Sequence, residues 1–168
     1  CKAVSIDVTV KCRLGVNNQK PEVILPEFLS KIYDSGVNRV IIHARKAWLD
    51  GLSPKQNRDI PPLDYEIVSR MKRKFENLHV SINGGISTFS SAKMFIDRDF
   101  DGVMVGRASY KTPWDILSKV DEIIYQDISK RKTRFDILMK MVPYIKDHLE
   151  KGGKVNHITR HMIGLFNG

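Results

Sequence analysis

The stretch Val80-Ser81-Ile82-Asn83-Gly84-Gly85-Ile86 decides the fold that this sequence predicts. A short run rich in β-branched residues is typical of a buried strand, and the two glycines that follow indicate a turn at its end. Similar apolar runs occur at residues 8–10, 40–42 and 103–105. The sequence therefore predicts four short buried strands.

Apolar residues with helical spacing separate these strands. They are Phe28, Leu29, Ile32 and Tyr33 before Gly36, then Tyr65, Val68, Met71 and Phe75, and then Ala92, Phe95 and Ile96. Strands that are joined by helices run parallel, and such units wind right-handed. Residues 8–125 thus predict an α/β architecture, either an open doubly wound sheet or part of a (β/α)8 barrel.

A further helix is expected after the fourth strand. Thr112 is a suitable N-cap, Pro113 suits the first turn, and Asp115 can complete a capping box. The apolar residues of this helix are Leu117, Val120 and Ile124.

The last part of the chain has a different pattern. Residues 130–134 form a basic link, and helical spacing follows from Phe135 to Val142. Pro143 is expected to break or kink that helix, because proline lacks an N–H and crowds the preceding turn. Gly152-Gly153 ends it, and residues 156–166 predict one more short helix. We therefore expect an α/β domain over residues 1–125 and part of an all-helical domain over residues 126–168.

Composition and charge narrow the class of protein. The chain is 42% hydrophobic and 28% charged, which is typical of a folded globular domain. It has no apolar run of about 18 residues, so no membrane span is expected. Cys1 and Cys12 form neither a disulfide framework nor a metal-ligand spacing, which favours a cytoplasmic location.

The net charge of +9 is unevenly distributed, since residues 126–168 carry nine Lys and Arg against four Asp and Glu. Such a surplus of positive charge attracts polyanions, although a solvated basic surface is the more common explanation.

Polar residues follow each predicted strand. They are Lys11 and Arg13, then His43, Arg45 and Lys46, then Asn83-Gly84-Gly85, and finally Gly106-Arg107. Ligands of parallel α/β folds bind at the carboxyl ends of the strands. Glycines let backbone N–H groups approach an anion, and an arginine adds a charge-assisted contact. Each feature alone also has a structural explanation: a solvated charge, a hydrogen-bonded histidine or a plain turn. Together they favour a cofactor that carries phosphate.

The number of strands indicates a partial barrel. A complete (β/α)8 barrel needs about 250 residues and eight strands, and its phosphate site commonly uses the last two strand loops. Here four strands precede the tail, and the last two end in glycine-rich loops. We therefore expect the C-terminal half of a (β/α)8 TIM barrel.

Long, ordered stretches of the chain match those of a known family. They are Val8-Thr9-Val10-Lys11-Cys12-Arg13-Leu14-Gly15, Ile41-Ile42-His43-Ala44-Arg45-Lys46-Ala47-Trp48-Leu49, Gly51-Leu52-Ser53-Pro54-Lys55, Asn57-Arg58, Pro61-Pro62-Leu63-Asp64-Tyr65, Ser81-Ile82-Asn83-Gly84-Gly85-Ile86 and Asp101-Gly102-Val103-Met104-Val105-Gly106-Arg107. In these stretches the chain resembles the tRNA-dihydrouridine synthases. Lys46-Ala47-Trp48-Leu49 and His157-Ile158-Thr159-Arg160-His161-Met162 are similar to the bacterial A subfamily.

The resemblance implies a flavin mononucleotide (FMN) enzyme that is reduced by NADPH and converts a D-loop uridine of tRNA to dihydrouridine. The flavin passes hydride to C6 of the uridine, and a cysteine protonates C5. By similarity, Lys11 and His43 contact the flavin ring. The residues implied to hold its phosphate end are Asn83, Gly84, Gly85, Gly106 and Arg107.

We expect tRNA at two basic patches, the first by similarity and the second from the charge of the tail. Arg45 and Lys46 are expected near the RNA, and Lys132 and Arg134 of the tail are expected to form a second contact. The family's acid cysteine lies in an Asn-Val-Gly-Cys-Pro motif, and these 168 residues contain no such motif. We therefore expect a C-terminal fragment that is inactive alone, taken from a full-length protein that is a monomer.

Two other functions stay open at this point. Another flavin-dependent barrel oxidoreductase would share the lysine, the glycine pair and the Gly-Arg ending, but it would not explain the basic tail. A non-catalytic RNA-binding remnant would explain only the basic tail. An intact cysteine motif upstream would favour the enzyme.

Overall fold

A computed structural model describes residues 3–98 and 100–167, which form two compact units. The first unit consists of the residues up to Ile86 together with Met94–Met104. The second consists of Ser87–Lys93 and the residues from Val105 onward.

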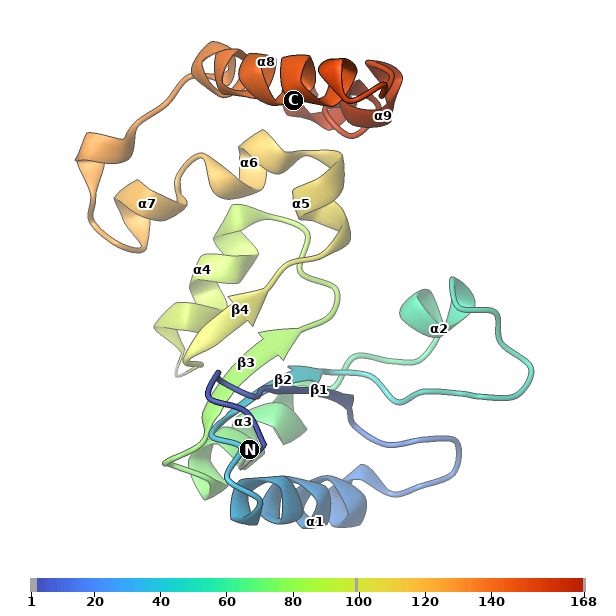
Figure 1. Ribbon diagram of the computed structural model, residues 1–168. Helices are drawn as coiled ribbons and strands as arrows, with labels where there is room; N and C mark the ends of the chain where they lie inside the picture. The colour runs from blue at the N-terminus through green and yellow to red at the C-terminus, as the bar shows by residue number, and fades with distance from the viewer. Residues whose placement is uncertain (1–2, 99, 168) are drawn as a thin grey trace. The chain divides into compact units, whose positions relative to one another are not determined.

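The first unit is built on a parallel sheet of four strands in the order β1-β2-β3-β4 (Figure 1). The strands are β1 (Val10–Arg13), β2 (Arg39–His43), β3 (His79–Asn83) and β4 (Gly102–Met104). The helices between them are α1 (Pro21–Asp34), α2 (Gln56–Asp59), α3 (Tyr65–Lys74) and α4 (Phe89–Asp97). The predicted α/β class with a parallel sheet is confirmed.

The core of this unit lies on one face of the sheet. Val40 and Ile42 of β2 and Val80 and Ile82 of β3 are all fully buried. Leu25 and Leu29 of α1 and Ile67 and Val68 of α3 are buried with them, and both helices lie on the same side of the sheet (Figure 1). Burying one such side chain stabilises the fold by about 1.5–3 kcal/mol. The other face of the sheet is left to more polar residues.

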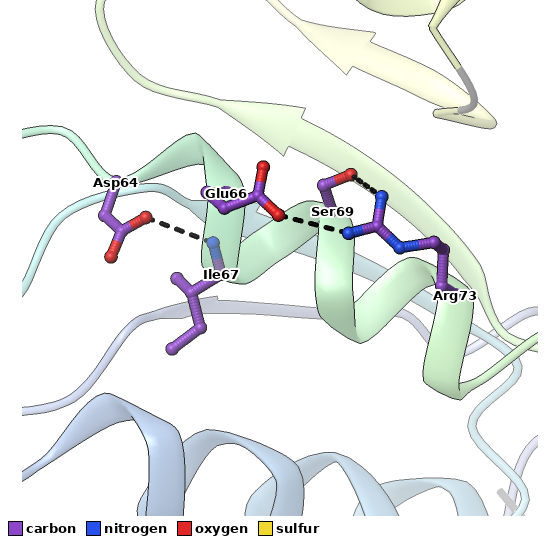
Figure 2. A network of polar contacts seen from close by, with 5 residues as sticks. All are labelled: Asp64, Glu66, Ile67, Ser69 and Arg73. Atoms are coloured by element: carbon purple, nitrogen blue, oxygen red, sulfur yellow. Dashed lines mark hydrogen bonds and ion pairs between the residues drawn. The ribbon is translucent and has the colours of Figure 1, made fainter.

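Helix α3 begins and ends as its sequence dictates. Asp64 is the N-cap, and its Oδ1 accepts a hydrogen bond from the Ile67 N–H at 3.0 Å (Figure 2). On the exposed side, Arg73 donates to Ser69 at 2.8 Å and to Glu66 at 3.1 Å. These surface contacts add little, so the helix owes its place to the buried apolar face.

The second unit is helical among its described residues. Its elements are α5 (Arg107–Lys111), α6 (Pro113–Leu117), α7 (Val120–Ile123), the 3-10 helix η1 (Ile128–Lys130), α8 (Arg134–Glu150), α9 (Asn156–Thr159) and the 3-10 helix η2 (Ile163–Phe166). Thr133 and Asp136 form a capping box that starts α8. Gly152, with φ +82°, follows the C-cap of α8, as the glycine pair predicted.

Strand β1 departs from the sequence prediction. It begins at Val10 rather than Val8, so Lys11 and Arg13 lie inside the strand and not after it. Lys11 is exposed and Arg13 half-buried, because side chains alternate and both share the face that α1 and α3 do not cover. Polar residues at these alternate positions look like a strand end in the sequence.

One helix prediction was also wrong in detail, and of the break or kink predicted at Pro143 the break is not observed. The single helix expected after Thr112 is divided into α6 and α7, and Thr112 makes no side-chain cap. Its Oγ1 donates instead to the Ala108 carbonyl oxygen at 3.3 Å. Pro143 does not break α8, which continues through it. Pro143 is exposed, so water can reach the carbonyl that loses its N–H partner.

Asp101 fixes the start of β4. Its Oδ2 accepts hydrogen bonds from the Val80 N–H at 2.7 Å and from Lys72 Nζ at 2.8 Å. Partial burial raises the pKa of Asp101, but the bonds from Lys72 and Val80 outweigh it and lower the pKa below its ordinary value. A carboxyl whose folded pKa is depressed stabilises the fold above its unfolded pKa, and this contribution is lost as pH falls through the folded pKa.

We predict that Asp101→Asn lowers the free energy of unfolding by about 1 kcal/mol at pH 7, because Lys72 loses its ionic partner. The deficit should shrink as pH falls below about 4, where the wild-type carboxyl also becomes neutral. Urea unfolding of both proteins across pH 3–7 measures this, with Glu66→Gln, which alters an exposed ion pair, as the control. A deficit that stays constant with pH would contradict the electrostatic assignment.

Candidate functional site

The carboxyl ends of the first three strands form one row. Arg13, His43 and Asn83 are register partners on neighbouring strands, about 5 Å apart from strand to strand. Lys11 lies two residues before Arg13 and therefore on the same face of the sheet. The structure thus aligns Arg13, His43 and Asn83 at the carboxyl edge of the sheet, and it places Lys11 on the same face but inside β1 rather than at its end.

Cys12 occupies the opposite face of β1. It alternates with Lys11 and Arg13 and lies in the row of the buried Ile42 and Ile82. Burial raises the pKa of the Cys12 thiol to about 11, although the charge of Lys11 opposes this. The thiol is therefore protonated at neutral pH and points away from the face that carries Lys11. Cys1 lies outside the described residues.

The glycine pair after β3 is required by conformation and by space. Gly84 has φ +111° and Gly85 has φ +69°, in the region that side chains disfavour. A Cβ on Gly84 would lie 2.5 Å from His43 Cδ2, and a Cβ on Gly85 would lie 2.5 Å from Leu63 Cδ1. The His43 ring therefore packs directly against the backbone of Gly84.

Asn83 joins two strand ends. Its Nδ2 donates to the Met104 carbonyl oxygen at 2.7 Å, and its own carbonyl oxygen accepts from the Ala44 N–H at 2.9 Å. The side chain thus links the ends of β3 and β4, while the backbone links β3 to the residue after His43. Asn83 helps to fix the spacing of the row.

Gly106 and Arg107 belong to the second unit. Gly106 precedes α5 and has open space where its Cβ would be, and Arg107 is the exposed first residue of α5. Gly84 and Gly85 belong to the first unit. Their contribution to one shared site stays a prediction.

The long loop between β2 and α3 is held by internal hydrogen bonds. Arg13 Nη1 donates to the carbonyl oxygens of Lys46 and Asn57, both at 2.9 Å. Arg45 Nη1 donates to those of Asp59, at 3.1 Å, and Pro61. The guanidinium groups of Arg13 and Arg45 therefore shape the loop, which sequence reasoning did not predict for either residue.

Asn57 holds the middle of this loop. Its Oδ1 accepts from the Trp48 N–H at 2.8 Å, and its Nδ2 donates to the carbonyl oxygens of Trp48 and Leu52. Lys46 Nζ lies 5.5 Å from the centroid of the Trp48 ring, within cation–π range. A cation and an aromatic ring are thus presented together on an ordered loop.

Positive charge is concentrated around this loop. Burial lowers the pKa of Arg13, and the neighbouring charges of Arg45 and Arg58 lower it further. Lys55 and Arg58 are exposed on or next to α2. We name Lys46, Trp48, Lys55 and Arg58 the loop patch. Its chemistry suits a polyanion with stacking bases.

A second group of cations lies in the helical unit. Lys132 is exposed, and the Arg134 guanidinium lies 5.4 Å from the centroid of the Trp114 ring. Trp114, Lys132 and Ile137 contribute to the lining of a cavity of about 200 Å³. We name Lys132, Arg134 and Trp114 the tail patch. Trp114 was not predicted as part of it, because its only sequence signal was that of a helix start.

Leu63 and Tyr65 were also missed. Both belong to the stretch Pro61-Pro62-Leu63-Asp64-Tyr65, which carries family resemblance but suggests no chemistry by itself. The structure places both side chains against the glycine pair. They lie about 20 residues before the glycine pair in the sequence, so only the folded structure reveals that role.

Over residues 3–98 and 100–167, no group of three or more His, Cys, Asp and Glu side chains could hold a metal ion. None of the helices described there is both long and apolar enough to cross a membrane.

The fold and this edge define an α/β protein with a basic, glycine-lined site at the carboxyl ends of parallel strands. The family model for dihydrouridine synthase (Dus) matches residues 1–168. The chain therefore belongs to the dihydrouridine synthase family, as the resemblance predicted.

Similar proteins are named tRNA-dihydrouridine(20/20a) synthase. The one from Shewanella oneidensis is 47% identical over 167 residues, which cover 99% of this chain and 49% of the relative. That from Salmonella typhi is 48% identical over 166 residues, covering 98% and 49%. That from Synechocystis is 43% identical over 167 residues, covering 99% and 49%. The chain spans about half the length of these curated relatives.

We predict that Gly84→Ala destabilises the flavin-free protein by about 1–3 kcal/mol, because the new methyl group meets His43 at a positive φ. Gly106→Ala is the matched control, since the space around Gly106 is open and its φ is −107°. Thermal unfolding of both variants measures the difference. Equal melting temperatures would show that His43 does not pack on Gly84 in solution.

Proposed function

We propose that this chain supplies half of an FMN-dependent, NADPH-reduced enzyme that converts uridine to 5,6-dihydrouridine in the D-loop of tRNA. The observation that carries the proposal is the carboxyl edge that brings His43 next to the glycine pair, with Lys11 on the same face of the sheet, in a member of the dihydrouridine synthase family. Residues 1–125 would form the C-terminal half of the TIM barrel. Residues 126–168 would form part of a helical tRNA-binding domain.

The residues at the edge fit the chemical demands of FMN. The cofactor has an anionic phosphate and a ring that gains negative charge on reduction. Lys11 offers a cation on the exposed face of β1. The glycine pair and Gly106 have no side chains, so their backbone can approach a ligand closely, and Arg107 offers a charge-assisted donor. When bound, the flavin supplies the hydride carrier that side chains lack.

We assign roles to these residues accordingly. The Lys11 ammonium stabilises negative charge on the pyrimidine part of the ring. His43 lies on the same face, with its ring position limited by Gly84. Asn83 maintains the spacing of the strand ends. Because Cys12 lies on the opposite face, we assign the proton for uridine C5 to a different group.

The two patches suit tRNA. The loop patch combines cations with Trp48, and the tail patch combines cations with Trp114. Cations bind phosphates, while aromatic rings stack on unpaired bases. A uridine of folded tRNA must leave its stack to reach a cofactor at strand ends. Arg45 would act near the RNA through the loop that it holds.

We predict that the full-length protein purifies with FMN and forms dihydrouridine from NADPH and unmodified tRNA, and that Arg107→Ala lowers FMN occupancy. The reason is loss of a charge-assisted hydrogen bond to phosphate, which corresponds to roughly tenfold weaker binding. Flavin absorbance per protein and mass analysis of the tRNA nucleosides measure both effects.

Arg70→Ala, which removes an exposed arginine from α3, is the matched control and should keep full occupancy. Full FMN occupancy in Arg107→Ala would remove Arg107 from the phosphate site. Absence of dihydrouridine with the FMN-loaded wild type would refute the proposed activity.

We predict that replacing Lys132 and Arg134 by Ala weakens tRNA binding and reduces the salt dependence of log affinity by roughly two units of slope or a little less, because two phosphate contacts disappear. Affinity of the full-length protein measured from low to high salt tests this. Lys20→Ala with Lys31→Ala removes two charges at α1 and should leave the slope unchanged.

Arg134→Lys separates charge from packing in the tail patch. It keeps the cation but replaces the planar group that lies over Trp114. An unchanged slope in the double alanine variant would exclude both residues from the interface. If Arg134→Lys reduces the slope as much as Arg134→Ala does, the effect of Arg134 comes from its packing on Trp114.

A further inference from the structure

The glycine pair is supported by two side chains from one short segment. Leu63 Cδ2 lies 3.1 Å from the Cβ position of Gly84, and its Cδ1 lies 2.5 Å from that of Gly85. Tyr65 Oη donates a hydrogen bond to the Gly84 carbonyl oxygen at 2.7 Å. The same oxygen atom of Tyr65 lies 2.9 Å from the Cβ position of Gly85.

Tyr65 is itself held firmly. It is the first residue of α3, and the preceding Asp64 donates its N–H to the Ala44 carbonyl oxygen at 2.8 Å and caps the helix through Ile67 (Figure 2). The Tyr65 ring packs on Phe95 with centroids 4.7 Å apart. Burial raises the pKa of Tyr65, although the charge of Arg45 opposes this, so the phenol keeps its proton and can donate.

The hydrogen bond to Gly84 has a geometric consequence. A peptide group is planar and trans, so the Gly84 carbonyl and the Gly85 N–H point in opposite directions. When Tyr65 holds the carbonyl, it also sets the direction of the Gly85 N–H. Gly85 is exposed, whereas Gly84 is buried. Two glycines in sequence have wide conformational freedom, and the hydroxyl selects one orientation.

We propose that Tyr65 is a positioning residue for the flavin phosphate: its hydroxyl fixes the Gly84–Gly85 peptide plane and so directs the Gly85 N–H toward the phosphate group. This inference rests on the proposed function, which places the phosphate at the glycine pair. Tyr65 acts through the backbone and does not touch the reacting atoms. The Leu63 side chain packs against the same two glycines and restricts their movement.

The test compares two flavins that differ by the phosphate alone. Tyr65→Phe removes the hydroxyl and keeps the ring that packs on Phe95. In the flavin-stripped full-length protein, its affinity for FMN should fall roughly 3- to 10-fold. Its affinity for riboflavin, which lacks the phosphate, should be unchanged. Fluorescence titration with each flavin measures both values, and Tyr33→Phe on α1 is the matched control.

The possible outcomes separate this inference from the proposed function. Equal loss of affinity for both flavins, or no loss for either, overturns the role of Tyr65 while leaving FMN binding in place. If the wild type binds FMN no more tightly than riboflavin, the phosphate site itself is wrong and the inference falls with it. The phosphorus NMR signal of bound FMN gives an independent readout, which should shift in Tyr65→Phe and not in Tyr33→Phe.

Discussion

The structure depends on the parallel pairing of β2 with β3. This pairing aligns Val40 with Val80 and Ile42 with Ile82, so four fully buried side chains meet α1 and α3 on one face. The same register aligns His43 with Asn83 at the carboxyl edge. A slip of one residue would turn the buried set outward and the polar set inward. The apolar core therefore fixes the geometry of the site, and the two cannot vary independently.

The sequence predicted the fold where burial dominates. The central strands β2 and β3 were located within one residue at each end, because alternate residues of their β-branched runs are fully buried in both strands. The predicted position of β1 was two residues too early, because Lys11 and Arg13 are polar residues within a strand that has one open face. The division between α6 and α7 falls at Ser118 and Lys119, which are not strong helix breakers, so local propensity could not reveal it.

The position of a residue at this edge was predictable where the residue directly follows or ends a strand. His43, Asn83 and the glycine pair were found in this way, since their place in the chain determines their place at the edge. Leu63 and Tyr65 could not be found, because their role depends on how the loop after β2 returns to the sheet. For Arg45, whose charge suggested RNA, the structure shows Nη1 donating to two loop carbonyl oxygens, and its contact with RNA stays a prediction.

The loop after β2 connects the two halves of the proposed function. Its outer part carries the loop patch, and its end, Pro61 to Tyr65, lies against the glycine pair. Arg13 and Arg45, each through Nη1, and Asn57, through Nδ2, donate to loop carbonyls, so in the proposed function the loop would have little freedom to lose on binding RNA. In the proposed function, Lys46, Lys55 and Arg58 would bind phosphates, and these hydrogen bonds would maintain their placement. In the proposed function, Arg45 would thus contribute to RNA affinity also through the order that it imposes on the cations around it.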